Sequence, residues 1–194
     1  MLVVSRASRS CLAAICAIAL YQPGAQLAPL HVSQKAGTSG ATNPVKMVIR
    51  TDRAKYSPRD TLKLNAALEN TGDKTVYVDR RMFWTGYTGG LKLVITDEQG
   101  KSLPARLLGD ALMPPPKDGD TSILVRLEPG FFYGTSMGLI VKALFTKPGR
   151  YQLRVIYKSW LSKELVLPQF RELPALWADK PEIVSKPLWI EVTK

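Results

Sequence analysis

The residues best suited to bind a partner lie close together in one short segment. Between Arg80 and Gly90 the sequence combines two cations, three aromatic rings and three glycines. Arginine and tryptophan are enriched at the energetic centres of interfaces, and glycine allows the backbone to present aromatic side chains. We therefore expect a binding loop here, unless Phe83 and Trp84 instead close the open end of a hydrophobic core. The candidate binding residues are Arg80, Arg81, Phe83, Trp84 and Tyr87.

The side chains that most often perform catalysis are scarce in this chain. Its single histidine is His31, and its two cysteines are Cys11 and Cys16, all within the first 31 residues. A Ser-His-Asp triad needs a base with a near-neutral pKa, and thiolate chemistry needs a cysteine. Paired carboxylates could hydrolyse a glycosidic bond, but the acidic residues are scattered through turns and solvent-facing strand positions. We expect no catalytic residues, no enzyme activity and no cofactor.

A metal site is not expected either. Asp118-Gly119-Asp120 resembles a fragment of a calcium-binding loop. It lacks a third oxygen ligand at loop spacing and a closing glutamate, so it is better explained as a solvated turn.

The chain is strongly basic. It has 27 Lys and Arg against 16 Asp and Glu, which gives a net charge of +11. They include an early group of Lys46, Arg50, Arg53, Lys55 and Arg59 and a late group of Lys142, Lys147, Arg150, Arg154, Lys158 and Lys163. Because these residues alternate with apolar positions, they are expected on solvated outer faces of strands, and no nucleic-acid platform is predicted. Anionic envelope polymers, or peripheral contact with an anionic membrane surface, would suit such a charge.

The N-terminus has the pattern of a signal peptide. Arg6 and Arg9 precede an apolar run from Cys11 to Leu20. This run is about half the length needed to span a bilayer, so it predicts a cleaved signal rather than an anchor. We predict a signal peptide over 1–28, a flexible linker over 29–44 and export to the periplasm or the extracellular space. The exported chain would carry no cysteine and a net charge of +9, with 25 basic against 16 acidic residues.

From residue 45 onward, apolar residues alternate with polar ones, which predicts short strands with one buried face. Turn signals such as Asn70-Thr71-Gly72-Asp73 and Glu128-Pro129-Gly130 separate the runs. The pattern predicts an all-β fold, an antiparallel two-sheet sandwich of 7–9 strands over 45–194. Seven strands are expected, with an eighth over 131–136, around the following runs: Val45–Ile49, Leu62–Leu68, Val76–Val78, Leu91–Ile95, Ile123–Leu127, Tyr151–Tyr157 and Leu188–Val192. Residues 159–186 do not show this alternation of apolar and polar residues. They are expected to form an insertion over a sheet edge, with a helical turn near 173–179.

The segment from Phe145 to Tyr157 resembles the approach to the sixth strand of immunoglobulin-like and fibronectin-like sandwiches. In that resemblance Tyr151 would form a structural tyrosine corner, in which its hydroxyl closes the chain back on itself. Together with Lys55–Asp60 and Leu68–Asp73, the pattern is similar to secreted bacterial immunoglobulin-like domains. A fainter similarity, through Leu91–Gly100 and Leu127–Gly130, is to the intracellular proteinase inhibitor family.

These observations favour an exported, non-enzymatic binding or structural domain. It would present loops, among them Arg80 to Gly90, to an envelope protein or polysaccharide. The alternative is an exported proteinase inhibitor, in which the proline-rich segment 109–121 enters a protease cleft, stiffened by three consecutive prolines.

Overall fold

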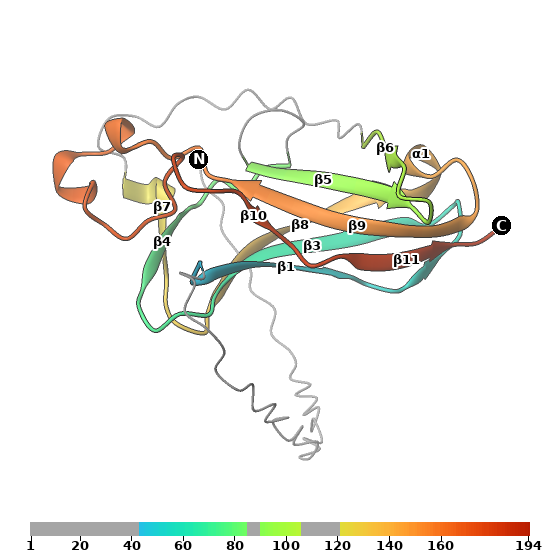
Figure 1. Ribbon diagram of the computed structural model, residues 1–194, viewed down its shortest axis with the longest axis horizontal. Coiled ribbons are helices and arrows are strands. Elements are labelled where there is room, and N and C mark those ends of the chain that lie inside the picture. The colour runs from blue at the N-terminus through green and yellow to red at the C-terminus, as the bar shows by residue number, and fades with distance from the viewer. Residues whose placement is uncertain (1–42, 85–89, 106–120) are drawn as a thin grey trace, which may run out of the picture. The chain divides into compact units, whose positions relative to one another are not determined.

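The computed structural model describes residues 43–84, 90–105 and 121–194. About half of these residues lie in strands and few lie in helical turns (Figure 1), so the predicted all-β class is confirmed. The strands are β1 (Val45–Thr51), β2 (Lys55–Tyr56), β3 (Thr61–Asn70), β4 (Val76–Asp79), β5 (Gly90–Asp97), β6 (Ser102–Leu103), β7 (Leu124–Leu127), β8 (Phe132–Ile140), β9 (Gly149–Lys158), β10 (Ile183–Val184) and β11 (Leu188–Val192). The helical segments are α1 (Val141–Leu144) and the 3-10 turns η1 (Thr121–Ile123), η2 (Lys163–Leu165) and η3 (Pro168–Phe170).

All eight predicted strands are present among these elements, but the described residues form eleven strands in three sheets instead of the expected 7–9 strands in two. The eighth is longer than expected, because β8 continues to Ile140. The run that begins at Ile123 starts one residue later, since Ile123 closes the turn η1. The two-residue strands β2, β6 and β10 were not predicted, because two residues are too few for alternation to be visible.

One sheet contains three antiparallel strands in the order β1-β3-β8. The central strand β3 pairs with β1 from Val45 opposite Asn70, and with β8 from Thr61 opposite Ile140. Its inward residues are buried and its outward residues are more exposed, as the alternation in the sequence predicts.

The second sheet has the order β2-β11-β9-β5-β6, with β10 also paired to β9. Strand β9 is its centre and is antiparallel to both β5 and β11. Strand β2 is the exception, because it runs parallel to β11, with Tyr56 opposite Val192.

The inward faces of the two sheets contribute to one hydrophobic cluster. Leu62 and Leu64 of β3 belong to it together with Leu153 and Val155 of β9, and each is at most 1% exposed. Figure 1 shows β5 and β9 overlying β3 and β1 in this view. Burial of these side chains is the main driving force that holds the two sheets together.

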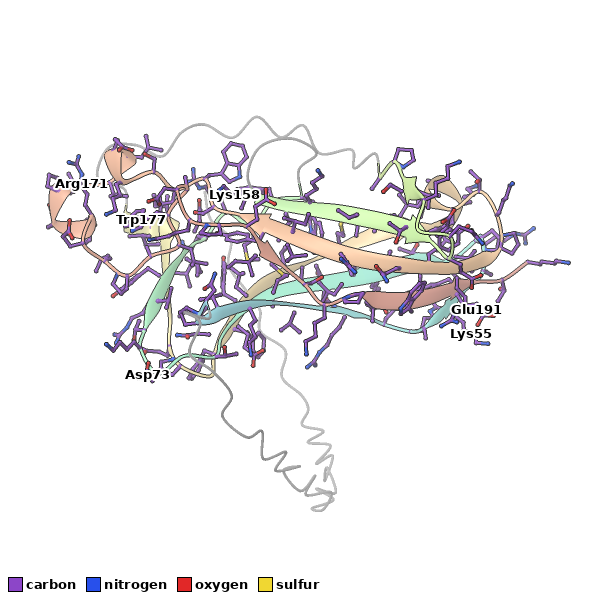
Figure 2. All side chains as sticks on the ribbon, in the orientation of Figure 1. Lys55, Asp73, Lys158, Arg171, Trp177 and Glu191 are labelled. Carbon is purple, nitrogen blue, oxygen red and sulfur yellow. The ribbon has the colours of Figure 1, made fainter. Side chains whose placement is uncertain are left out.

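The segment between β9 and β11 packs against the short pair β4 and β7. Tyr77 of β4 bonds to this segment through its amide and carbonyl groups, with Pro174 O at 2.9 Å and Leu176 N at 2.9 Å. Trp177, in the part of the segment labelled in Figure 2, belongs to a second cluster with Ile123 and Leu161. These bonds occupy the edge of β4 that would otherwise accept another strand.

The helical turn expected near residues 173–179 is wrong. The structure places helical turns at η2 and η3 instead; Ala175 forms a bridge with Tyr77, and a single turn follows in which Lys180 N donates to Trp177 O at 3.0 Å. Pro168 at the first position of η3 favours a turn there. The backbone hydrogen bonds of Tyr77 with Pro174 O and Leu176 N keep residues 174–176 out of a helical turn.

The predicted signal peptide and most of the predicted linker lie outside the described residues. The last two linker positions, Asn43 and Pro44, are described, and both accept hydrogen bonds from the domain. Asn43 Oδ1 accepts a bond from Val45 N at 3.0 Å, and Pro44 O accepts one from Thr71 N at 2.7 Å. Within the described ranges, no helix is long and apolar enough to cross a membrane.

Candidate functional site

The segment after β4 begins with a buried ion pair. Asp79, whose side chain is 1% exposed, accepts bonds from Arg81 Nε at 2.9 Å, Arg81 Nη2 at 2.8 Å and Arg81 N at 2.8 Å. The planar guanidinium meets the carboxylate with two parallel bonds, which is the strong geometry for this pair. Arg81 is therefore engaged within the domain, whereas the neighbouring Arg80 side chain is exposed.

The aromatic part of the same segment lies against the core. Met82 is a buried member of the main cluster, and Trp84 packs against that cluster while half-buried. Phe83 is also half-buried, and its carbonyl accepts a bond from Leu91 N at 2.6 Å. Tyr87 lies outside the described residues. Of the predicted binding residues that are described, only Arg80 extends into solvent.

Two buried polar atoms near this end of β5 make no hydrogen bond to the described part of the chain. They are Trp84 Nε1 and the hydroxyl of Tyr157. Both residues adjoin Leu91, which pairs with Tyr157 across the sheet and forms a bridge with Trp84. Burial raises the pKa of Tyr157 well above its ordinary value of 10; nearby Ser159 opposes this shift in part, and the charge of Asp79 adds to it.

Replacing Tyr157 by phenylalanine is expected to change the free energy of unfolding by less than about 1 kcal/mol at neutral pH, because the buried hydroxyl forms no well-aligned hydrogen bond within the described residues although Ser159 and Asp79 lie near it. Above about pH 10 the unfolded chain loses the Tyr157 proton while the folded chain keeps it. Stability therefore falls as the pH rises through this range, and Tyr157→Phe should make the fall less steep. Urea unfolding from pH 7 to 11 measures both effects.

Tyr133→Phe is the matched control for this experiment. The Tyr133 hydroxyl donates to Arg80 O at 3.0 Å, so its removal should lower stability by about 1 kcal/mol. Destabilisation of Tyr157→Phe at pH 7 by the same amount would show that the Tyr157 hydroxyl has a partner.

A larger surface is formed by the outer face of the sheet that contains β5, β9 and β11. Outward positions on these strands carry four cations and several apolar side chains instead of a balanced mixture of charges. The cations are Lys92, Arg150, Arg154 and Lys158. We call these four residues, with Trp189, the basic face.

None of the four cations of the basic face forms an ion pair with an acid in the described ranges. Arg150 lies opposite Glu191, but Glu191 Oε2 is 3.0 Å from Lys55 Nζ. Figure 2 labels this Lys55 and Glu191 pair at one end of the sheet and Lys158 toward the other. Lys158 Nζ donates to the carbonyl of Lys180 at 2.8 Å, which leaves its charge uncompensated.

An exposed tryptophan lies among these charges. Trp189 is 42% exposed, and the guanidinium carbon of Arg150 is 5.4 Å from the centre of its ring. Such a cation over an aromatic face is favourable and keeps both groups at the surface in a defined position. Val184 of β10, at 50% exposure, adds an aliphatic patch beside β9. This arrangement can attract an anionic polymer and pack against its apolar parts.

Part of this surface is predictable from the sequence. Arg150, Arg154 and Lys158 are among the basic residues that alternate with apolar positions, whereas Lys92 and Trp189 were not expected to belong to a site. Their signal was the same alternation, because Trp189 lies between the inward residues Leu188 and Ile190 of the last strand. Among the earlier basic residues, Arg53 and Lys55 are used in ion pairs with Asp52, Asp60 and Glu191.

Tyr151 lies near the start of β9. Its hydroxyl donates to Lys147 O at 2.7 Å, four residues earlier in the chain, and its ring packs against Phe145 with centroids 4.6 Å apart. Burial raises the pKa of Tyr151, and the charge of Asp97 adds to this.

In the described ranges, no group of three or more His, Cys, Asp or Glu side chains is placed to hold a metal ion. The Asp118-Gly119-Asp120 segment lies outside those ranges. So does the proline-rich segment 109–121 of the inhibitor alternative, apart from Thr121.

Comparison with protein-family models gives no match, and no curated protein matches the chain. The solved structures that match include a β-glucosidase from Erythrobacter marinus, with 14% identity, a TM-score of 0.36 and coverage of 77% of this chain. A β-glucosidase from Listeria innocua in complex with laminaribiose matches with 9% identity, a TM-score of 0.32 and the same coverage. The chain spans only 15% and 16% of the length of these enzymes.

Proposed function

We propose that this chain is an exported, non-enzymatic binding domain of immunoglobulin-like topology, and that its basic face binds an anionic polymer of the cell envelope. The observation that carries the proposal is the group of four cations without acidic partners around the exposed Trp189. A charged surface of one sign attracts a polymer of the opposite sign and speeds its association.

The immunoglobulin-like topology is supported by strand order. A three-stranded antiparallel sheet faces a second sheet in which β9 lies between β5 and β11. In immunoglobulin-like domains a tyrosine near the start of the sixth main strand bonds back to the preceding backbone, as Tyr151 does to Lys147. Such a frame holds the outer face of β5, β9 and β11 rigid, so little ordering is required when a ligand binds.

The absence of catalysis in this proposal rests on residue types. From residue 45 onward the sequence contains neither histidine nor cysteine. The predicted signal peptide supports an envelope location, where anionic polysaccharides and lipid head groups are available ligands. The loop from Arg80 to Gly90 remains a predicted second contact through Arg80.

Binding of the purified protein to dextran sulfate, with uncharged dextran as the matched polymer, tests the proposal. We expect affinity for the sulfated polymer that falls steeply as salt rises from 50 to 300 mM, because salt screens charges at the surface. Equal affinity for the two polymers, or affinity independent of salt, would refute it. Vesicles with and without anionic lipid, measured in parallel, distinguish a membrane from a soluble polymer as the source of the charge.

A further inference from the structure

The opposite sheet carries a hollow on its own outer face. It has a volume of about 510 Å³ and lies over β1, the second half of β3 and the first half of β8. None of its lining residues belongs to the basic face, so an inference about it does not depend on the function proposed above.

The floor of the hollow consists of small side chains aligned across the three strands. Ala67 of β3 lies opposite Val48 of β1 on one side and opposite Gly134 of β8 on the other. Since facing residues point to the same side of a sheet, these three positions form one row. The row is low because it contains glycine and alanine.

Gly134 cannot be replaced without moving a strand. A Cβ atom at this position would lie 2.6 Å from Ala67 Cβ and would also collide with the carbonyl oxygen of Ala66. The glycine therefore permits the close approach of β8 to β3 and leaves the floor open at the same point. The hollow is built into the strand pairing.

Polar side chains form the row on one side of the floor. Arg50, Asn65 and Ser136 face one another across β1, β3 and β8. None of the three makes a side-chain hydrogen bond to another described residue, so all are available to a ligand. Together they offer guanidinium donors, an amide that both donates and accepts, and a hydroxyl.

The row on the other side contains an aromatic ring and a carboxylate. Phe132 is 75% exposed and lies opposite Glu69 on β3. Rows two residues apart are separated by about 6.8 Å and neighbouring strands by about 4.8 Å, so the three rows enclose a site of about one or two sugar rings. The charges of Arg50 and Glu69 cancel across it.

We propose that this hollow is a binding site for a neutral glycan. A pyranose ring presents C–H groups on its faces, which pack against the negative face of an aromatic ring such as Phe132. Its hydroxyls both donate and accept hydrogen bonds, and they match the mixed donors and acceptors of Arg50, Asn65, Ser136 and Glu69. Such sites combine an apolar surface with a few convergent polar groups. An anionic ligand would lose near Glu69 what it gains near Arg50, whereas a purely apolar one would leave the polar row unpaired.

Titration of the purified full-length protein with cellohexaose, laminarihexaose and chitohexaose tests this site. We expect at least one of the three to bind, with no dependence on salt. Phe132→Ala should weaken that binding about tenfold or more, and Ala67→Leu should abolish it by filling the floor. Phe131→Ala is the matched control, because Phe131 is 65% exposed at the neighbouring position but does not line the hollow.

No binding of any of the three sugars at millimolar concentration, or equal losses in Phe131→Ala and Phe132→Ala, would overturn the proposal. So would binding of an extended peptide along β8 in place of the sugars. Because Ala67→Leu could impair folding, thermal unfolding of each variant is recorded beside its titration, and Phe132→Ala provides the decisive result. Replacing the cations of the basic face should leave sugar binding unchanged, so the two proposals fail separately.

Discussion

Replacing Asp79 by alanine is expected to lower the free energy of unfolding by about 3–5 kcal/mol, because it leaves the Arg81 guanidinium partly buried without its carboxylate. The Asp79 side chain is 1% exposed and that of Arg81 is 15% exposed, so water cannot fully replace the lost contacts. The substitution also removes the acceptor of the Arg81 amide. Chemical denaturation monitored by tryptophan fluorescence measures the change. The total free energy of unfolding of a typical domain is only about 5–15 kcal/mol, so this loss would be a large fraction of it.

Two variants define the cause of this loss. Asp79→Asn keeps an oxygen that can accept the Arg81 amide bond but removes the charge, so it should cost less than alanine. Lys55→Ala removes an ion pair that is 70% and 40% exposed, and it should cost less than about 1 kcal/mol. If Asp79→Ala cost no more than Lys55→Ala, the buried pair would not be a major determinant of stability.

The second large effect is expected in binding. Replacing the four cations of the basic face by glutamine should weaken binding to dextran sulfate about a thousandfold at low salt. Each cation near an anionic surface contributes about 1 kcal/mol, and every 1.4 kcal/mol is a factor of ten. The variant should also lose most of the salt dependence, because fewer charges remain to be screened. Isothermal titration at 50 and 200 mM salt measures both quantities.

The control for this variant removes the same charge elsewhere. Arg59, Lys63, Lys74 and Lys142 are exposed, lie outside the basic face and form no ion pair within the described ranges. Their replacement by glutamine should reduce affinity only modestly, through net charge. Equal losses in the two variants would mean that the net charge of the chain, and not the arrangement on β5, β9 and β11, governs binding.

The fold was predictable where one physical pattern dominates. In β3 and β9 the alternation of buried and exposed residues continues over ten residues, so strand positions and inward faces follow from the sequence. The parallel pairing of β2 with β11 was not predictable. It joins Tyr56 to Val192, and no local pattern reports which distant strand will lie beside a two-residue segment. The helical turn was misplaced for the same reason, since bonds to Tyr77 decide the conformation near Ala175.

The candidate site was predictable only in part. The sequence identified the cationic and aromatic side chains in the segment after β4. The two parallel hydrogen bonds that engage Arg81, however, depend on the burial of Asp79. Burial is a property of the whole fold, so the sequence could not separate the engaged Arg81 from the exposed Arg80. The basic face and the hollow arise from register. Val48, Ala67 and Gly134 are distant in the chain and form one row only once three strands are paired.

The most direct test of the proposed binding function is a map of the backbone amide signals of the ¹⁵N-labelled protein during titration with dextran sulfate. We expect the signals that shift most to lie on β5, β9 and β11 around Lys92, Arg154 and Trp189, and to return toward their free positions when salt is added. Shifts confined to the β1-β3-β8 sheet, or spread evenly over all exposed lysines and arginines, would contradict the proposed function.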